Sequence, residues 1–144
     1  MPTALRFSDD ADILRYEPTF EQHVKKVNGS WDHWRLVAIK EIDRKLRARR
    51  GTSDVFELGR IGERSREGLR DVEAWLAIHF AFVAADSQGA EPNTYFARKA
   101  GHYFSRAMDA LDSEASALDY DTGNDGKITP DEQQRPFVAR IRRG

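Results

Sequence analysis

Residues 119–136, DYDTGNDGKITPDEQQRP, contain the side chains of this chain that are best suited to bind a metal ion. A calcium loop of the helix–loop–helix type needs oxygen ligands at fixed positions, glycine at the sixth position and a bidentate acid at the twelfth. Gly126 fits the sixth position. The ligands then fall, in order, on Asp121, Asp125, the backbone carbonyl of Lys127, Thr129 and Glu132.

This loop departs from the calcium pattern at one ligand and in its surroundings. The third position is Gly123, which has no side chain, and the loss of one ligand lowers affinity by about tenfold or more. Pro136 ends the following helix within about two turns, and the chain has no second loop to pair with. An Asp/Gly/Asn turn with calcium as an optional ligand is the favoured interpretation. The alternative is a calcium-binding regulatory module with a single degenerate EF-hand loop.

Other residue types that often do chemistry are not arranged to do so. The four histidines (His23, His33, His79 and His102) share no short spacing, so a zinc site is not indicated. His79 lies near the apolar face of a predicted helix, which favours a hydrogen-bonded core or interface histidine. The sequence has no glycine-rich phosphate loop, no G-x-S-x-G and no H-E-x-x-H. We therefore do not expect an enzyme.

Composition limits the classes of function. Acidic and basic residues number 24 and 23, so the net charge of −1 does not suggest a strong nucleic-acid binder. Cysteine is absent, which excludes disulfides and thiolate metal sites. No apolar run reaches the length of about 18 residues that predicts a membrane-spanning helix.

Charged side chains of the predicted helices have simple interpretations. The acid pairs Glu63/Glu67 and Asp71/Glu73 are expected to be solvated. The arginines nearby alternate with these acids and offer partners four residues away; they are Arg60, Arg64, Arg66 and Arg70. The arginine-rich stretch 44–50 is suited to nucleic acid, to a solvated helix end or to a protein interface, and the sequence does not separate these alternatives.

Hydrophobic periodicity predicts three long helices near residues 30–50, 62–86 and 93–118. Ser30 is a suitable N-cap for the first of them, and Gly51 ends it. The second is apolar around much of its circumference, which indicates that it packs on more than one side. The residues expected to be mostly buried are Trp34, Ile42, Leu69, Leu76, Phe80, Phe96 and Tyr103.

The remaining segments are shorter. Residues 19–28 are expected to form a short helix with Phe20, Val24 and Val27 on one side, ending at Asn28 and Gly29. Residues 1–18 are expected to be irregular, with an extended piece at 13–16. Together these elements predict an all-α fold. It is a helical bundle of three long helices plus one or two short ones, with extended N- and C-terminal arms. We divide the chain into a bundle at 1–118 and a turn with a docking arm at 119–144.

The last ten residues, RPFVARIRRG, are too short to fold alone and combine alternating apolar residues with arginines. An extended segment of this kind can add a strand to another chain, which then pairs with its backbone. The residues expected to bind a partner are Arg135, Phe137, Val138, Arg140, Ile141, Arg142 and Arg143.

The order of these segments is similar to that of one protein family. The chain has DADILRYEP, a tryptophan-bearing helix ending in RKLRARRG, then LRDVEAWLAIHFAFVAAD and YFARKAGHYFSRAMDAL. LDYDTGNDGKI and the terminal RPFVARIRRG follow. By this layout, over most of its length, the chain resembles the head–tail connector (adaptor, or head completion) proteins of tailed bacteriophages and phage-derived particles.

The resemblance implies a structural role without catalysis. Such proteins form a ring, often of twelve copies, beneath the portal protein of the capsid, and the next tail or stopper component binds below. DNA passes through the ring without sequence-specific binding, and no membrane is involved. The implied location is the virion neck, after synthesis in the cytoplasm of the bacterial host. The loop 121–132 and the tail 135–144 are the segments to which the family's docking role would apply.

Overall fold

The structure is a computed structural model that describes residues 7–50, 59, 61–87, 94–116 and 118. The described residues form helices and no strand, which confirms the predicted all-α bundle. Three helices are long and two are short, as predicted. They are α1 (Asp10–Tyr16), α2 (Phe20–His23), α3 (Asp32–Arg50), α4 (Glu63–Ser87) and α5 (Thr94–Ala115). None of them is both long enough and apolar enough to cross a membrane.

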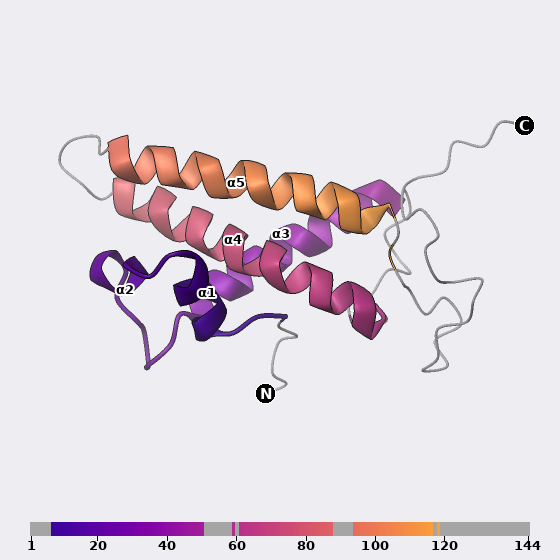
Figure 1. Ribbon diagram of the computed structural model, residues 1–144, viewed down its shortest axis with the longest axis horizontal. Coiled ribbons are helices and arrows are strands. Elements are labelled where there is room, and N and C mark those ends of the chain that lie inside the picture. Colours follow the sequence, from indigo (N-terminus) through magenta and orange to yellow (C-terminus); the bar gives the residue numbers. More distant parts are fainter. Residues whose placement is uncertain (1–6, 51–58, 60, 88–93, 117, 119–144) are drawn as a thin grey trace, which may run out of the picture.

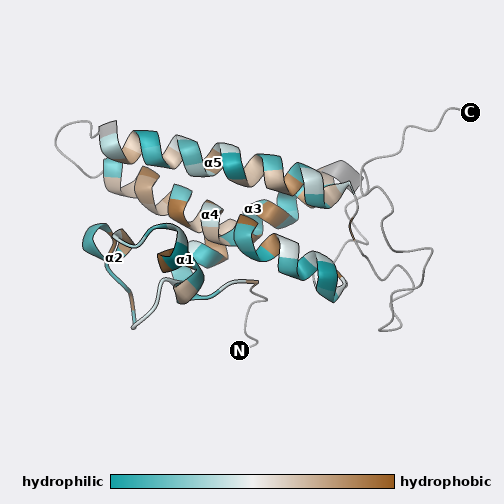
Figure 2. Cartoon of the chain, viewed as in Figure 1, coloured by the Kyte–Doolittle hydropathy of each residue, from teal (hydrophilic) through white to brown (hydrophobic). Residues whose placement is uncertain are grey.

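Helix α4 is the central element of the bundle. It packs along α5 and also contacts α3 and α1 (Figure 1). The seven consecutive residues from Val72 to Ile78 are all buried, and seven residues cover nearly two helical turns. This confirms that the helix is covered on more than one side. Figure 2 shows hydrophobic residues along the middle of α4 and more hydrophilic ones towards its start.

The predicted core is mostly correct. Ile42, Leu69, Leu76 and Tyr103 are buried. The other three members lie at the edge of the core and are partly buried; they are Trp34, Phe80 and Phe96. The prediction omitted several of the largest buried side chains, which come from the N-terminal third and the end of α4; they include Ile13, Phe20, Trp31 and Phe82. The core therefore reaches into a region that was expected to be irregular.

The expected extended piece at 13–16 is wrong, because these residues belong to α1. The helix begins with a capping box. The Asp9 side chain accepts a hydrogen bond from the Asp12 backbone N–H, and the Asp12 side chain accepts one from the Asp9 backbone N–H. Such reciprocal caps stabilise a helix start, although the third-position residue is usually Glu or Gln. The short helix brings Ile13 into the core.

Helix α2 is shorter than predicted and ends at His23. Val27 is 62% exposed and so is not part of a buried stripe. Asn28 and Gly29 do form the expected turn, with φ angles of 54° and 80°. Positive φ at both central residues is typical of the tight turn that reverses a hairpin. Val27 and Ser30 pair across it through two backbone hydrogen bonds of 2.9 and 3.2 Å.

The three long helices begin close to the predicted positions. Helix α3 starts at Asp32, where the Ser30 hydroxyl accepts a hydrogen bond from the Asp32 backbone N–H at 3.3 Å. Helix α4 extends one residue beyond the predicted end, and α5 stops at Ala115, before the predicted end at 118. Leu118 is nevertheless buried and belongs to the hydrophobic core.

Candidate functional site

The predicted calcium ligands and docking residues all lie within 119–144, outside the described residues. The described part of the chain therefore does not test those predictions. Among the described residues, no three His, Asp or Glu side chains come close enough together to hold a metal ion. The polar site that the structure does define lies at the other end of the chain, where the segment from Phe7 to Glu17 meets the bundle.

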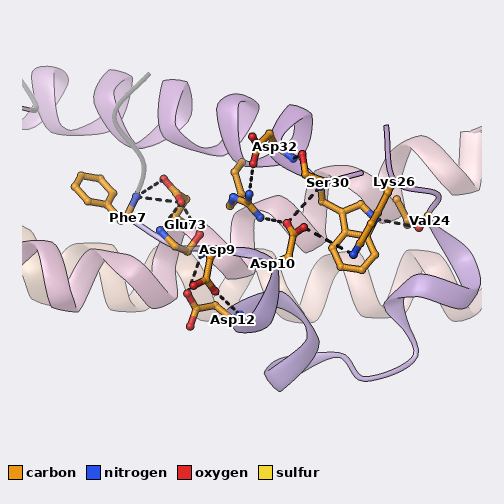
Figure 3. Close-up of polar contacts among 12 residues, drawn as sticks. Phe7, Asp9, Asp10, Asp12, Val24, Lys26, Ser30, Asp32 and Glu73 are labelled. Atoms are coloured by element: carbon orange, nitrogen blue, oxygen red, sulfur yellow. Dashed lines mark hydrogen bonds and ion pairs between the residues drawn. The ribbon is translucent and has the colours of Figure 1, made fainter. Parts of the chain in front are cut away.

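Glu73 is the centre of this site and corrects one prediction. It was expected to be solvated, but its side chain is 0% exposed. Its carboxylate accepts hydrogen bonds from the backbone N–H groups of Phe7 (3.1 and 3.2 Å) and Ser8 (2.8 Å) and from the Ser8 hydroxyl. Figure 3 shows Phe7 beside the Glu73 carboxylate. The N-terminal segment, more than 60 residues away in sequence, covers this face of α4 and excludes water from it.

The charge of Glu73 is held in a dry environment. Burial raises the pKa of Glu73, while the hydrogen bonds from Ser8 and Phe7 and the nearby charge of Arg35 act in the opposite direction. A carboxylate that accepts several hydrogen bonds can bind a backbone tightly, because each bond to a charged group is stronger than a neutral one. Glu73 thus fixes Phe7 and Ser8 against α4.

Arg35 is the buried cation of the same region. Its guanidinium pairs with Asp10 at the start of α1. It also pairs with Asp32 in the first turn of α3, the helix to which Arg35 itself belongs. Asp10 also accepts a hydrogen bond from the Trp31 backbone N–H at 3.2 Å and lies 4.0 Å from the Lys26 ammonium (Figure 3). These contacts join α1 to the start of α3.

Asp12 joins α1 to α4. Its carboxylate accepts a hydrogen bond from Arg70 Nε at 2.9 Å and is 3% exposed. Burial opposes its ionisation, but the hydrogen bonds from Arg70 and Asp9 outweigh this, so the pKa of Asp12 is lowered. Arg15 adds an exposed ion pair with Asp71 at 3.1 Å. Arg70 therefore has an acidic partner from another helix, which the spacing along α4 alone did not indicate.

Glu17 joins the end of α1 to α5. One carboxylate oxygen accepts hydrogen bonds from the Tyr103 hydroxyl at 2.8 Å and the Lys99 ammonium at 3.2 Å. The other oxygen accepts bonds from the hydroxyls of Thr19 and Tyr95, each at 3.1 Å. Although burial opposes it, the bonds from Tyr103 and Lys99 lower the pKa of Glu17. Burial and the Glu17 charge raise the pKa of Tyr103.

We call these four carboxylates, Asp10, Asp12, Glu17 and Glu73, the N-terminal clamp. Each of them accepts hydrogen bonds from protein groups on a different part of the chain. Together they bind the segment from Phe7 to Glu17 to α3, α4 and α5. Chemically, this arrangement is suited to holding a backbone in place, because its oxygens point at donors of the protein itself.

A shallow pocket borders the clamp at the start of α4. Its volume is about 210 Å³, and it is lined by Phe7, Glu63, Arg66, Glu67 and Arg70. Ligand pockets generally occupy about 300–1,000 Å³ and are mostly apolar. This pocket is smaller and carries charges of both signs, so it suits water or small ions better than an organic ligand.

Two further sequence predictions concern His79 and the arginine-rich stretch of α3. His79 is a hydrogen-bonded histidine at the helix interface, as predicted, because its Nδ1 lies 2.8 Å from the Ala100 carbonyl oxygen of α5. In the arginine-rich stretch, Arg44 pairs with Glu41 at 2.6 Å and Arg47 with Asp43 at 2.9 Å. These pairs neutralise part of the positive charge that a nucleic acid would contact.

The clamp was missed by sequence reasoning, although one signal pointed to it. Glu73 interrupts an otherwise apolar run, with Val72 before it and Ala74, Trp75 and Leu76 after it. An acid in a helix that is apolar on several sides has no solvent to face, so it needs a buried partner. The identity of that partner, a backbone segment near the N-terminus, is not encoded in any local spacing.

Comparison with known proteins adds no relative. No family model, curated protein or solved structure matches this chain. Its function is therefore inferred from the bundle, the clamp and the sequence of the C-terminal residues.

Proposed function

We propose that the protein is a structural head–tail connector of a tailed bacteriophage or a phage-derived particle. Copies of the chain would form a ring between the portal protein and the tail components and let DNA pass through. The supporting observation is the contrast between a bundle whose N-terminal segment is firmly clamped and a C-terminal sequence suited to docking. The proposal assigns no catalysis to the protein.

The bundle has the properties that a ring subunit needs. Its core extends from Ile13 to Leu118 and includes residues of all five helices or their immediate flanks. The clamp fixes the N-terminal segment through four buried or half-buried carboxylates, so the position of that segment relative to α3, α4 and α5 is defined. A body of this kind can hold its neighbours in register, because packed cores are stiff.

The C-terminal residues supply the proposed docking element. Leu118, three residues after the end of α5, is buried, and residues 119–144 follow it in the sequence. In the proposal, the Asp/Gly-rich stretch redirects the chain, and 135–144 adds a strand to the portal protein. Phe137, Val138 and Ile141 would fill alternate pockets, while the arginines would meet acidic groups or DNA phosphates.

Deletion of residues 135–144 tests this proposal. We expect the truncated protein to keep its helicity and melting temperature but to lose co-purification with the portal ring encoded by the same genome. The double variant Arg140→Glu/Arg142→Glu should weaken attachment, because charge complementarity guides docking. Lys40→Glu, a charge reversal at an exposed position of α3, is the matched control and should bind as the parent does.

Two results would contradict the proposal. Portal binding by the truncated protein at the parental level would show that the tail does not dock. Loss of helicity on truncation would show that the tail belongs to the bundle, which removes the physical argument for a docking arm.

A further inference from the structure

The outer face of α5 has an ordered pattern of charge. The helix lies at the edge of the bundle along α4 (Figure 1), and its outermost residues follow one another at steps of four, three, four and three. They are Arg98, His102, Ser105, Asp109 and Asp112, and all five are exposed. The basic residues occupy the first half of this stripe, the acidic residues the second half, and a serine lies between them.

This order is opposite to the one that helix stability favours. A helix dipole favours acids in the first turn and bases in the last turn. In α5 the first turn has no acid, the last turn has no base, and Asp112 lies in the last turn. Two cations on the flanks of α5 act within the fold, since Lys99 pairs with Glu17 and the Arg106 guanidinium lies 4.7 Å from the centre of the Trp75 ring. The order of charge along the exposed stripe therefore runs against the dipole of α5.

We propose that α5 pairs antiparallel with α5 of a second copy of this chain, through the stripe from Arg98 to Asp112. An antiparallel arrangement centred on Ser105 places Arg98 opposite Asp112 of the second copy. It also brings His102 near Asp109. Each pair occurs twice because of the two-fold symmetry, so Arg98 of either copy meets a carboxylate of the other.

The surface between the charges permits close approach. Ser105 at the centre and Gly101 beside it are small, and a Cβ atom added at Gly101 would meet nothing within 4 Å. Small residues let two helix backbones come close. The 22-residue helix is about 33 Å long, so the contact is at the small end of protein interfaces, below about 1,200 Å². We expect a weak pairing that weakens further with salt.

The pairing of α5 is independent of the proposed connector function. A two-fold contact uses the same patch on both copies, whereas a ring needs a head-to-tail contact between two different patches. The pairing therefore would join two subunits, or two rings, without closing either. If the portal-binding test fails, the proposed pairing of α5 still stands. If α5 does not pair, the connector proposal still stands.

Cysteine cross-linking tests the geometry, because the full chain has no cysteine of its own. Under mild oxidation, Ser105→Cys should form a covalent dimer quickly, since the two Ser105 positions face each other. Ser113→Cys is the matched control, because Ser113 is also exposed but lies eight residues, about 12 Å along the helix axis, from the two-fold centre at Ser105. Circular dichroism checks that each variant is folded. Equal cross-linking of Ser105→Cys and Ser113→Cys would overturn the proposal.

Charge exchange tests the complementarity. In sedimentation experiments on the full chain, Arg98→Glu should weaken self-association by about tenfold, because two ion pairs are lost. The double variant Arg98→Glu/Asp112→Arg should restore it. Lys40→Glu, an exposed charge reversal on α3, should have no effect. About 0.5 M salt should abolish pairing of the parent, since screening then acts within a few ångströms. No self-association of the parent at low salt, or no rescue by the double variant, would contradict the proposal.

Discussion

The N-terminal segment and α5 both pack against α4, but the two contacts differ in chemistry. The contact with α5 consists largely of rings and small apolar residues. Phe82 and Phe96 stack at 5.4 Å, and Ala100 and Ala107 are buried between the helices. The contact with the N-terminal segment adds buried carboxylates to the apolar anchor Ile13.

The difference indicates that one contact mainly stabilises the fold, whereas the other mainly fixes where a segment lies. Burial of apolar surface is favourable in proportion to area and depends little on direction. A buried carboxylate is favourable only while its donors are in place, and its loss leaves donors unpaired in a dry environment. We therefore expect the α4–α5 contact to supply most of the free energy of folding and the N-terminal clamp to define where the first residues lie.

The largest effect should follow from a cavity in the apolar core. Leu76 of α4 is 0% exposed. Leu76→Ala should lower the free energy of unfolding by about 2–5 kcal/mol, because it removes buried methyl groups and leaves a void. Thermal or denaturant unfolding measures this. Val83→Ala, at a 45% exposed position of the same helix, is the control and should change stability far less. Similar melting of Leu76→Ala and the parent would refute the core assignment.

A smaller but more local effect should follow from loss of the clamp's central carboxylate. Glu73→Ala leaves the N–H groups of Phe7 and Ser8 without their acceptor, at a cost of about 1–3 kcal/mol. Amide hydrogen exchange should rise at these two residues more than in α5. Glu63→Ala is the control, because Glu63 is exposed on the same helix. Unchanged exchange at Phe7 and Ser8 would contradict the clamp.

The contributions of the clamp's carboxylates to stability should change with pH in opposite directions. The pKa values of Asp12 and Glu17 are lowered in the folded state. Their stabilisation is present above the unfolded values of about 3.9 and 4.3 and is lost as pH falls through the folded values. The pKa of Glu73 is raised by burial, so the folded protein takes up this proton before the unfolded chain does. Its contribution to stability therefore rises as pH falls towards about 4.3.

Melting temperatures between about pH 7 and pH 3 measure these opposing terms. Glu73→Gln should remove the contribution of Glu73 to stability that grows in the parent on mild acidification. Glu17→Gln should reduce the loss of stability at lower pH, because one of the two carboxylates with a lowered pKa has been removed. Identical profiles for the parent and both variants would show that the clamp does not titrate as its contacts indicate.

The sequence predicted the apolar contact better than the polar one, for a physical reason. Residues such as Leu69, Leu76 and Tyr103 recur with the helical period, and that period alone places them on an inward face. The positions of the long helices follow from the same pattern. The partly buried state of Trp34 and Phe80 depends on what covers the ends of the core, which periodicity does not contain.

The clamp was not predictable in the same way. Its contacts join residues far apart in sequence, such as Ser8 with Glu73 and Glu17 with Tyr103. An acid in a charge-rich helix is usually solvated, and nothing local distinguishes Glu73 from Glu67 except the apolar run around it. Helix α1 was missed because its cap uses Asp12 where the usual box has Glu or Gln. Burial against distant parts of the chain, rather than local propensity, determined both the clamp around Glu73 and the formation of α1.

The most direct test of the connector proposal is the position of the protein in an assembled particle. Particles produced with a tagged full-length chain can be labelled with gold and viewed by electron microscopy. The proposal predicts label at one vertex only, between the capsid and the tail, and loss of that label when residues 135–144 are deleted. Label spread over the capsid surface, or intact particles without any label, would contradict it.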